Sequence, residues 1–249
     1  MKHFQILLLL ALMLMNINLF AQFFTNASAT EYSATNTNGG IVPRITGNDV
    51  MNLGSNWYSV SVWDDPSIPA PELAFRVQIL TNTYSGHTAL AYTDITEADV
   101  CLIEDGTNVF AIVVYIQGAT PTYYWEEFQW IGSGTNAFVS NGATSFTSGT
   151  TSTTLNIESD NGGRFAIVWD DATPNVWIKV GSMSGGAPTT PAGCSSAFVS
   201  GSSPDVSIVQ YNLTTLVVIT YLQSGDLKVG YETYSDIAGN SCSINVMWL

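Results

Sequence analysis

The apolar run VFAIVVY at residues 109–115 decides the fold, because three similar runs recur along the chain at a regular spacing. They lie at 57–63, 164–169 and 216–221, and all four runs end in an aromatic residue. These closing aromatic residues, separated by 52, 54 and 52 residues, are Trp63, Tyr115, Trp169 and Tyr221. Short apolar runs of this kind are typical of strands buried on both faces. The fixed period indicates a repeated β unit.

Further strand-like segments flank each run. Shorter apolar pieces precede the runs at 41–45, 99–103, 154–157 and 205–209. Segments of alternating polarity follow them at 72–80, 123–131, 175–183 and 226–234. Weaker candidates for a fourth strand lie at 88–92, 136–139 and 197–199. No segment after residue 21 shows a helical period with caps, so the sequence predicts an all-β fold.

Four-stranded units that repeat at this period are the pattern of β-propeller blades. We expect about four blades, approximately at 41–92, 93–145, 146–199 and 200–249. A β-sandwich whose strands have this spacing by chance is the alternative. Ring closure stays open, because the apolar segment 243–249 could complete a sheet or begin a further blade. A second copy of the chain, or residues missing from this sequence, could also close an incomplete ring.

The repeats resemble those of secreted bacterial β-propeller proteins. Pro43-Arg44-Ile45, Trp63-Asp64-Asp65 and Trp169-Asp170-Asp171 carry the resemblance, which extends from about residue 41 to residue 234. The motifs are shared by propellers of many functions. The resemblance therefore implies an architecture and no particular activity.

The first 21 residues have the pattern of a secretory signal peptide. A basic start at Lys2 precedes the apolar stretch 6–15, and Ala21 is a small residue at the expected cleavage point. The leader is typical of Gram-negative bacteria, so we expect a secreted or cell-surface protein. Residues 22–40 would form an N-terminal segment before the repeat domain at 41–249. No later apolar stretch is long enough to span a membrane.

The charge of the chain argues against nucleic acid as a partner. The 249 residues carry a formal net charge of −14, with 20 acidic residues against 6 Lys plus Arg. Only 10% of the residues are charged, whereas 46% are hydrophobic. Nucleic-acid binding needs clustered basic side chains that displace counterions from phosphates. We therefore expect no nucleic-acid partner.

The three cysteines suggest one disulfide bond and one buried thiol. Cys194 and Cys242 both lie in Gly/Ser-rich turns, which makes them the expected pair in an oxidising compartment. Cys101 lies in an apolar run and is expected to pack as a small hydrophobic residue.

The residue types that most catalytic sites need are scarce in this sequence. After the leader the only histidine is His87, in a turn and without a nucleophile motif nearby, so neither a Ser-His-Asp triad nor a zinc site is indicated. We expect no cofactor. Calcium is conceivable from the excess of acids, although no Asp-x-Asp-x-Asp loop is present.

Carboxylates are plentiful and support one catalytic alternative, a glycosidase- or sialidase-like hydrolase on a propeller fold. Such enzymes use two carboxyl groups at a separation fixed by the fold. Arg44, Arg76 and Arg164 could bind a substrate carboxylate. Adjacent acids on a strand point to opposite faces, however, so the pairs at 64–65, 104–105, 126–127 and 170–171 are expected mainly to solubilise turns.

Aromatic residues support a different function. The segment 123–130 places rings on both faces of one strand, next to acids and amides that suit contact with a sugar or peptide. Its candidate ligand-binding residues are Tyr123, Tyr124, Trp125, Glu127 and Trp130. The leading hypothesis is a non-catalytic scaffold that binds extracellular glycans or proteins. A structural envelope or matrix subunit is the other alternative, and the oligomeric state stays open.

Overall fold

The computed structural model describes residues 46–54, 56–65, 72–79, 83–84, 88–90, 94–131, 138–148, 154–160, 162–185, 187–189, 191–194, 197–240 and 245–247. The chain divides into two compact units, Met1–Val42 and Pro43–Leu249, and every described residue belongs to the second.

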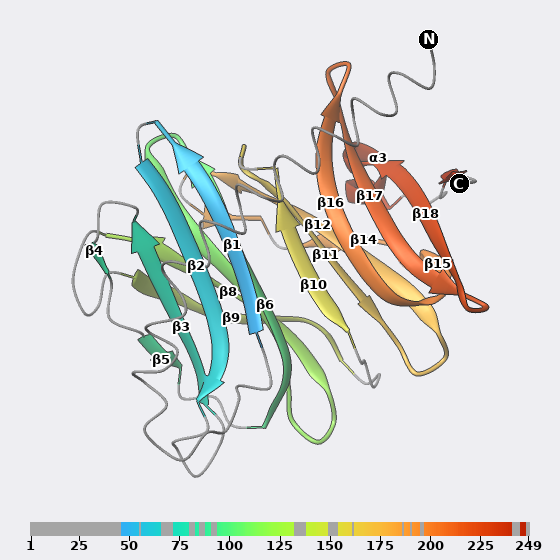
Figure 1. The fold of residues 1–249 in the computed structure, drawn as a ribbon, viewed down its shortest axis with the longest axis horizontal. Coiled ribbons are helices and arrows are strands. Elements are labelled where there is room, and N and C mark those ends of the chain that lie inside the picture. The colour runs from blue at the N-terminus through green and yellow to red at the C-terminus, as the bar shows by residue number, and fades with distance from the viewer. Residues whose placement is uncertain are drawn as a thin grey trace. The chain divides into compact units, whose positions relative to one another are not determined.

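Four antiparallel sheets, each formed by consecutive strands, make up the described part of the chain (Figure 1). The first sheet contains β1 (Thr46–Leu53), β2 (Asn56–Asp65) and β3 (Glu72–Ile79), with β4 (Thr83–Tyr84) and β5 (Thr88–Leu90) paired to β3. The second contains β6 (Ile95–Asp105), β7 (Asn108–Gln117), β8 (Thr122–Trp130) and β9 (Phe138–Ser148).

The third and fourth sheets repeat this order. The third contains β10 (Leu155–Ser159), β11 (Arg164–Asp170) and β12 (Asn175–Ser184), with β13 (Ala187–Pro188), β14 (Ala192–Gly193) and β15 (Val199–Ser200) paired to β12. The fourth contains β16 (Ser202–Tyr211), β17 (Thr214–Gln223), β18 (Asp226–Thr233) and β19 (Asn245–Met247). The predicted all-β class is confirmed.

Helical structure plays a minor part in the described portion of the chain. The short helix α3 (Tyr234–Ala238) follows β18 and buries Ile237 in the core beneath the fourth sheet. Among the described residues, no helix has the length and apolar composition of a membrane span.

The strand register of the closing aromatic residues changes where the first strand of the first repeat lies. Trp63 pairs with Thr46, just as Tyr115 pairs with Ala98 in the second sheet. The first strand of the first sheet is therefore β1, whereas the sequence placed it at 41–45, outside the described residues. The prediction followed apolar runs, and β1 is mostly polar because only one of its faces is packed against another sheet.

Neighbouring sheets pack face to face and enclose three hydrophobic cores. The first core lies between the first and second sheets, the second core between the second and third, and the third core between the third and fourth. Tyr115 lies in the first core, Trp169 in the second and Tyr221 in the third, so each of these aromatic residues faces the preceding sheet. This repeated orientation follows from the regular spacing in the sequence.

Strands β7 and β11 are apolar on both faces because each lies between two cores. Val113 belongs to the first core, whereas its neighbours Ile112 and Val114 belong to the second. Side chains alternate across a strand, so a central strand that contributes to two cores cannot use polar residues on either face.

Gly181 provides a test of the second core. It pairs with Phe165, and a Cβ atom at position 181 would overlap the Phe165 ring. Gly181→Ala should lower the free energy of unfolding by about 1–3 kcal/mol, because overpacking moves the ring from its place. Denaturant unfolding measures this loss. In a Phe165→Leu background the same Gly181→Ala change should cost less, and equal losses in both backgrounds would contradict the overlap.

Candidate active site

The first strands of the four sheets are tied to one another by side chains. The Leu102 N–H of β6 donates to Asp49 Oδ2 of β1 over 2.7 Å. The Ile157 N–H of β10 donates to Asp99 Oδ2 of β6 over 2.9 Å. Two carboxyl groups thus bind the backbone of the next sheet.

A third link continues the series with an amide. Asn156 Nδ2 of β10 donates to the Pro204 carbonyl oxygen of β16 over 2.6 Å. The first strands are therefore in contact in chain order, β1 with β6, β6 with β10 and β10 with β16.

Acidic residues gather where these strands meet. Each first strand supplies one member of what we call the carboxyl cluster: Asp49, Asp99, Glu158 and Asp205. Mutual electrostatic effects connect them, because Asp49, Asp99 and Asp205 all raise the pKa of Glu158.

Gly47 makes room for one member of the cluster. A Cβ atom at position 47 would collide with the side chain and Cα atom of Asp99, so only glycine lets β1 approach this carboxyl group. The close approach lets Asp99 lie between β1 and the backbone of β10 that it binds.

Burial and like charges keep this cluster partly protonated. Burial raises the pKa of Asp99 to about 7, against the hydrogen bonds from Ile157 and Val100 that lower it. Burial also raises the pKa of Glu158 to about 8, and the neighbouring acids add to the effect. A carboxyl group with a pKa near 8 is protonated at neutral pH and can donate a proton.

Two members of the cluster keep oxygen atoms that other groups do not use. Both oxygens of Asp49 accept backbone N–H groups, from Val50 and Leu102. Among the described residues, Glu158 makes no hydrogen bond, and Asp205 accepts only the Val206 N–H, at Oδ1. Glu158 and Asp205 lie on neighbouring strands and are the two carboxyl groups available to a ligand.

The cluster does not have the geometry of a metal centre. Within the described ranges, no group of three or more His, Cys, Asp or Glu side chains is arranged to hold a metal ion. Cys101, which is buried next to the cluster, is also a poor nucleophile, because burial raises its pKa well above the ordinary value and Asp49, Glu158 and Asp99 raise it further.

The predicted aromatic site lies in the interior. Tyr123 and Trp125 belong to the second core, and Tyr124 and Trp130 pack against the first. Trp125 is only 7% exposed and Glu127 only 2%. Sheets pack on both faces of β8, so the rings lie in the cores or against them. A ligand-binding role for these residues stays a prediction.

The three predicted arginines are only partly described. Arg44 and the side chain of Arg76 lie outside the described residues. The Arg164 guanidinium donates from Nη1 to Thr215 Oγ1 over 2.6 Å and lies 3.4 Å from Asp160 Oδ2, so local partners engage it. A shared carboxylate-binding role stays a prediction.

The adjacent acids at 126–127 and 170–171 are buried, contrary to the expectation of solvated turns. Asp170 accepts the Thr154 and Ser203 N–H groups, which joins the third and fourth sheets. Burial would raise the pKa of Asp171, but hydrogen bonds from Trp177 and Thr173 outweigh it and lower that pKa. Asp170 and Asp171 thus satisfy backbone donors in place of water, and Glu126 accepts the Ser140 hydroxyl.

The cysteines are described in part. Cys101 is a free, fully buried thiol. Cys194 is in a disulfide bond, and Cys242 and His87 lie outside the described residues.

Sequence reasoning missed the carboxyl cluster, although a signal was present. Asp99 and Asp205 both stand 16 residues before a closing aromatic residue, Tyr115 and Tyr221. An acid at the same position of two apolar repeats indicates a special environment. Asp49 and Glu158 gave no such signal, because they come together only when the sheets pack.

Comparisons with known proteins give a distant likeness. No protein-family model matches the sequence, and no curated protein matches it. The chain is similar to the catalytic domain of a GH62 α-L-arabinofuranosidase from Coprinopsis cinerea, with 12% identity, a TM-score of 0.45, and coverage of 82% of this chain and 68% of that one. It is also similar to an α-L-arabinofuranosidase from Podospora anserina in complex with cellotriose, with 8% identity, a TM-score of 0.43, and coverage of 79% and 66%.

The comparison corrects the leading functional hypothesis. Both similar structures are glycoside hydrolases, which is in line with the hydrolase alternative and not with the expected non-catalytic scaffold. With TM-scores below 0.5, the likeness says nothing further about this chain. The case for hydrolysis rests on its own carboxyl groups.

The carboxyl cluster predicts how stability depends on pH. The folded-state pKa values of Asp99 and Glu158, about 7 and about 8, lie above their ordinary values of 3.8 and 4.5. The folded chain therefore binds more protons than the unfolded chain between these limits, and the stabilisation is lost as pH rises through about 8. The free energy of unfolding should fall by at least about 2 kcal/mol from pH 5 to pH 9.

Denaturant unfolding at each pH measures this change. Asp99→Asn, which keeps an acceptor for the Ile157 N–H, should flatten the pH dependence. An unchanged slope in that variant would contradict the assignment.

Proposed function

We propose that this chain hydrolyses glycosidic bonds, with Glu158 as the general acid and Asp205 as the second carboxyl group. One observation carries the proposal: burial raises the pKa of Glu158 to about 8, this side chain lacks a hydrogen-bond partner among the described residues, and the charge of Asp205, an exposed acid on the contacting strand β16, acts on it.

Glycoside hydrolysis needs two carboxyl groups in different protonation states. The leaving oxygen takes a proton from one, while the other, as a carboxylate, attacks the anomeric carbon or activates water. Glu158 supplies the proton. Asp205 keeps Oδ2 available for the second role, because only Oδ1 accepts a backbone N–H.

Asp49 and Asp99 act as positioning residues. Their hydrogen bonds fix β1, β6 and β10 next to one another, which sets the place of Glu158. Their charges raise the pKa of Glu158 and so keep its proton in place at neutral pH.

We further propose that the four sheets are blades of a β-propeller and that the carboxyl cluster lies where their innermost strands meet. Four sheets with three cores between them support a propeller over a two-sheet sandwich. Propellers bind ligands at this central region because residues from every blade converge there.

The chain is proposed to act outside the cytoplasm, as a secreted bacterial propeller protein on an extracellular glycan. The leader pattern of residues 1–21 supports export, and so does the disulfide bond at Cys194.

Purified protein tested on a panel of aryl glycosides, including α-L-arabinofuranosides, should release the aryl group. Glu158→Gln and Asp205→Asn should each lower kcat about 100-fold or more, because each removes a proton-transfer or carboxylate function. Asp226→Asn is the matched control, since Asp226 is an exposed acid of the same sheet that pairs with Lys228 outside the cluster. Equal activity of Glu158→Gln and the unmodified protein would overturn the proposal.

The pH profile of that activity should report the Glu158 proton. With the pKa of Glu158 near 8, kcat should stay high at neutral pH and decline as pH rises through about 8. Asp49→Asn should move this decline to lower pH, because it removes a neighbouring negative charge. Rates measured across the pH range test the shift, and Asp226→Asn should leave the profile in place.

A further inference from the structure

Two hydrogen-bond donors at the second core lack a partner in the described part of the chain. Trp125 of β8 is 7% exposed, and its indole Nε1 is buried without an acceptor among the described residues. Lys179 of β12 is half-buried, and its ammonium group makes neither a hydrogen bond nor an ion pair with any described residue. Buried polar groups are nearly always paired, so these two donors indicate a missing acceptor.

The second and third sheets, which carry these donors, run in the same direction. Asp99 of β6 accepts the Ile157 N–H of β10, and further along both strands the Leu102 carbonyl oxygen accepts the Ser159 hydroxyl. The first strands β6 and β10 are therefore parallel. Since neighbouring strands within each sheet are antiparallel, the third strands β8 and β12 are parallel as well.

Ring contacts place the two donors at the same level of the second core. The ring centroid of Tyr123 of β8 lies 5.7 Å from that of Trp169 of β11. Trp169 pairs with Trp177 of β12, so β8 and β12 are in step at this point. Two residues further along each strand, on the same faces, come Trp125 and Lys179. The two donors therefore converge from opposite sides of the core.

No described side chain supplies the acceptor. Gly193 pairs with Lys179 on the neighbouring strand β14 and has no side chain, since a Cβ atom there would overlap the lysine. Glu127 lies on the same face of β8 as Trp125, one step further along, and forms no ion pair with Lys179 within the described ranges. Burial lowers the pKa of Lys179, as expected for an ammonium group that no carboxylate compensates.

The donors fit a carboxylate better than other anions. A carboxylate has two acceptor oxygens, so one oxygen can take the indole N–H and the other the ammonium group. Its single negative charge balances the single positive charge of Lys179. A phosphate monoester would bring a second negative charge to a half-buried place in a chain whose net charge is −14.

Aromatic rings beside the donors can contact the apolar part of an organic acid. Trp177 lies two residues from Lys179 on the same face and is only partly buried. It stacks on Trp169, with ring centroids 6.4 Å apart and an angle of 11° between the rings. Phe146 of β9 packs edge-on against Trp169. This surface favours an acid with a flat ring, which can stack on Trp177.

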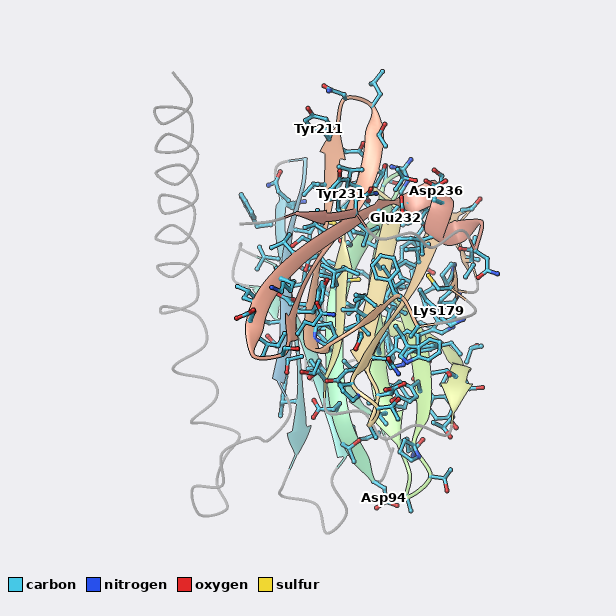
Figure 2. The ribbon with its side chains drawn as sticks, turned by 90° about the vertical axis from the view of Figure 1, so that its right-hand side faces the viewer. Asp94, Lys179, Tyr211, Tyr231, Glu232 and Asp236 are labelled. Atoms are coloured by element: carbon cyan, nitrogen blue, oxygen red, sulfur yellow. The ribbon has the colours of Figure 1, made fainter. Side chains whose placement is uncertain are left out.

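We infer that a small organic acid binds between the third strands of the second and third sheets, with its carboxylate held by the Trp125 indole N–H and the Lys179 ammonium group. The middle strands β7 and β11 separate these third strands from the first strands that carry the carboxyl cluster. Lys179 lies on the side of the ribbon away from the blue strand β1 (Figure 2). The inference is therefore independent of the proposed hydrolysis.

Nuclear magnetic resonance of the indole N–H groups tests the site in a buffer free of organic acids. Titration of the purified protein with benzoate should shift the Trp125 resonance to a saturating value. The loss of this resonance in Trp125→Phe identifies it. Lys179→Met keeps the apolar stem and should raise the dissociation constant for benzoate at least about tenfold, because the charged partner is removed. Lys179→Arg keeps the charge and should bind more tightly than Lys179→Met. Circular dichroism checks that each variant folds.

Lys228→Met is the matched control, because Lys228 is the other lysine after the leader and lies on β18 next to Asp226. It should change the dissociation constant less than about twofold. Benzamide has the shape of benzoate without its charge and should bind at least about tenfold more weakly. Phenyl phosphate should also bind more weakly than benzoate.

Three results would overturn the inference. The first is a Trp125 resonance that benzoate does not move at up to about 10 mM, as expected if another segment of the chain already fills the site. The second is an equal loss of affinity in Lys179→Met and Lys228→Met. The third is equal binding of benzamide and benzoate, which would indicate an apolar site without carboxylate recognition.

Discussion

The bonds between first strands are the constraint on which the rest of the described structure depends. Asp49 and Asp99 each bind a backbone N–H of the next sheet, and Asn156 binds a carbonyl oxygen of the last. These bonds satisfy backbone groups of strands that belong to different sheets. They also fix how the sheets meet, and therefore which faces enclose the three cores. Every closing aromatic residue from Tyr115 onward then faces the preceding sheet.

The same bonds explain the chemistry of the cluster. An acid that binds the backbone of a neighbouring sheet has to be buried, and burial favours its protonated form. Burial, together with the repulsion from the acids gathered there, raises the pKa of Glu158 to about 8. The carboxyl groups that hold the sheets together by hydrogen bonds thus also help to keep Glu158 protonated as a proton donor. Structure and proposed activity have one physical origin.

Much of the fold could be predicted from the sequence, but little of the site. Residues 109–115 identified a strand buried on both faces, and the spacing of the aromatic residues identified four units. The position of Trp125 in a core could not be predicted, because a strand with rings on both faces looks the same in the sequence whether one or two sheets cover it. The sequence did not point to Glu158, because the acids that help to raise its pKa lie more than 40 residues away in the sequence.

The sequence by itself determined the strand order, the all-β class and the repeat, because hydrophobic periodicity and turn residues act locally. Only the tertiary structure decided which acids meet and which of them keep a proton. These properties depend on distances between sheets and on the exclusion of water from their contacts. Neither the distances between sheets nor the exclusion of water can be read from a local pattern of residues.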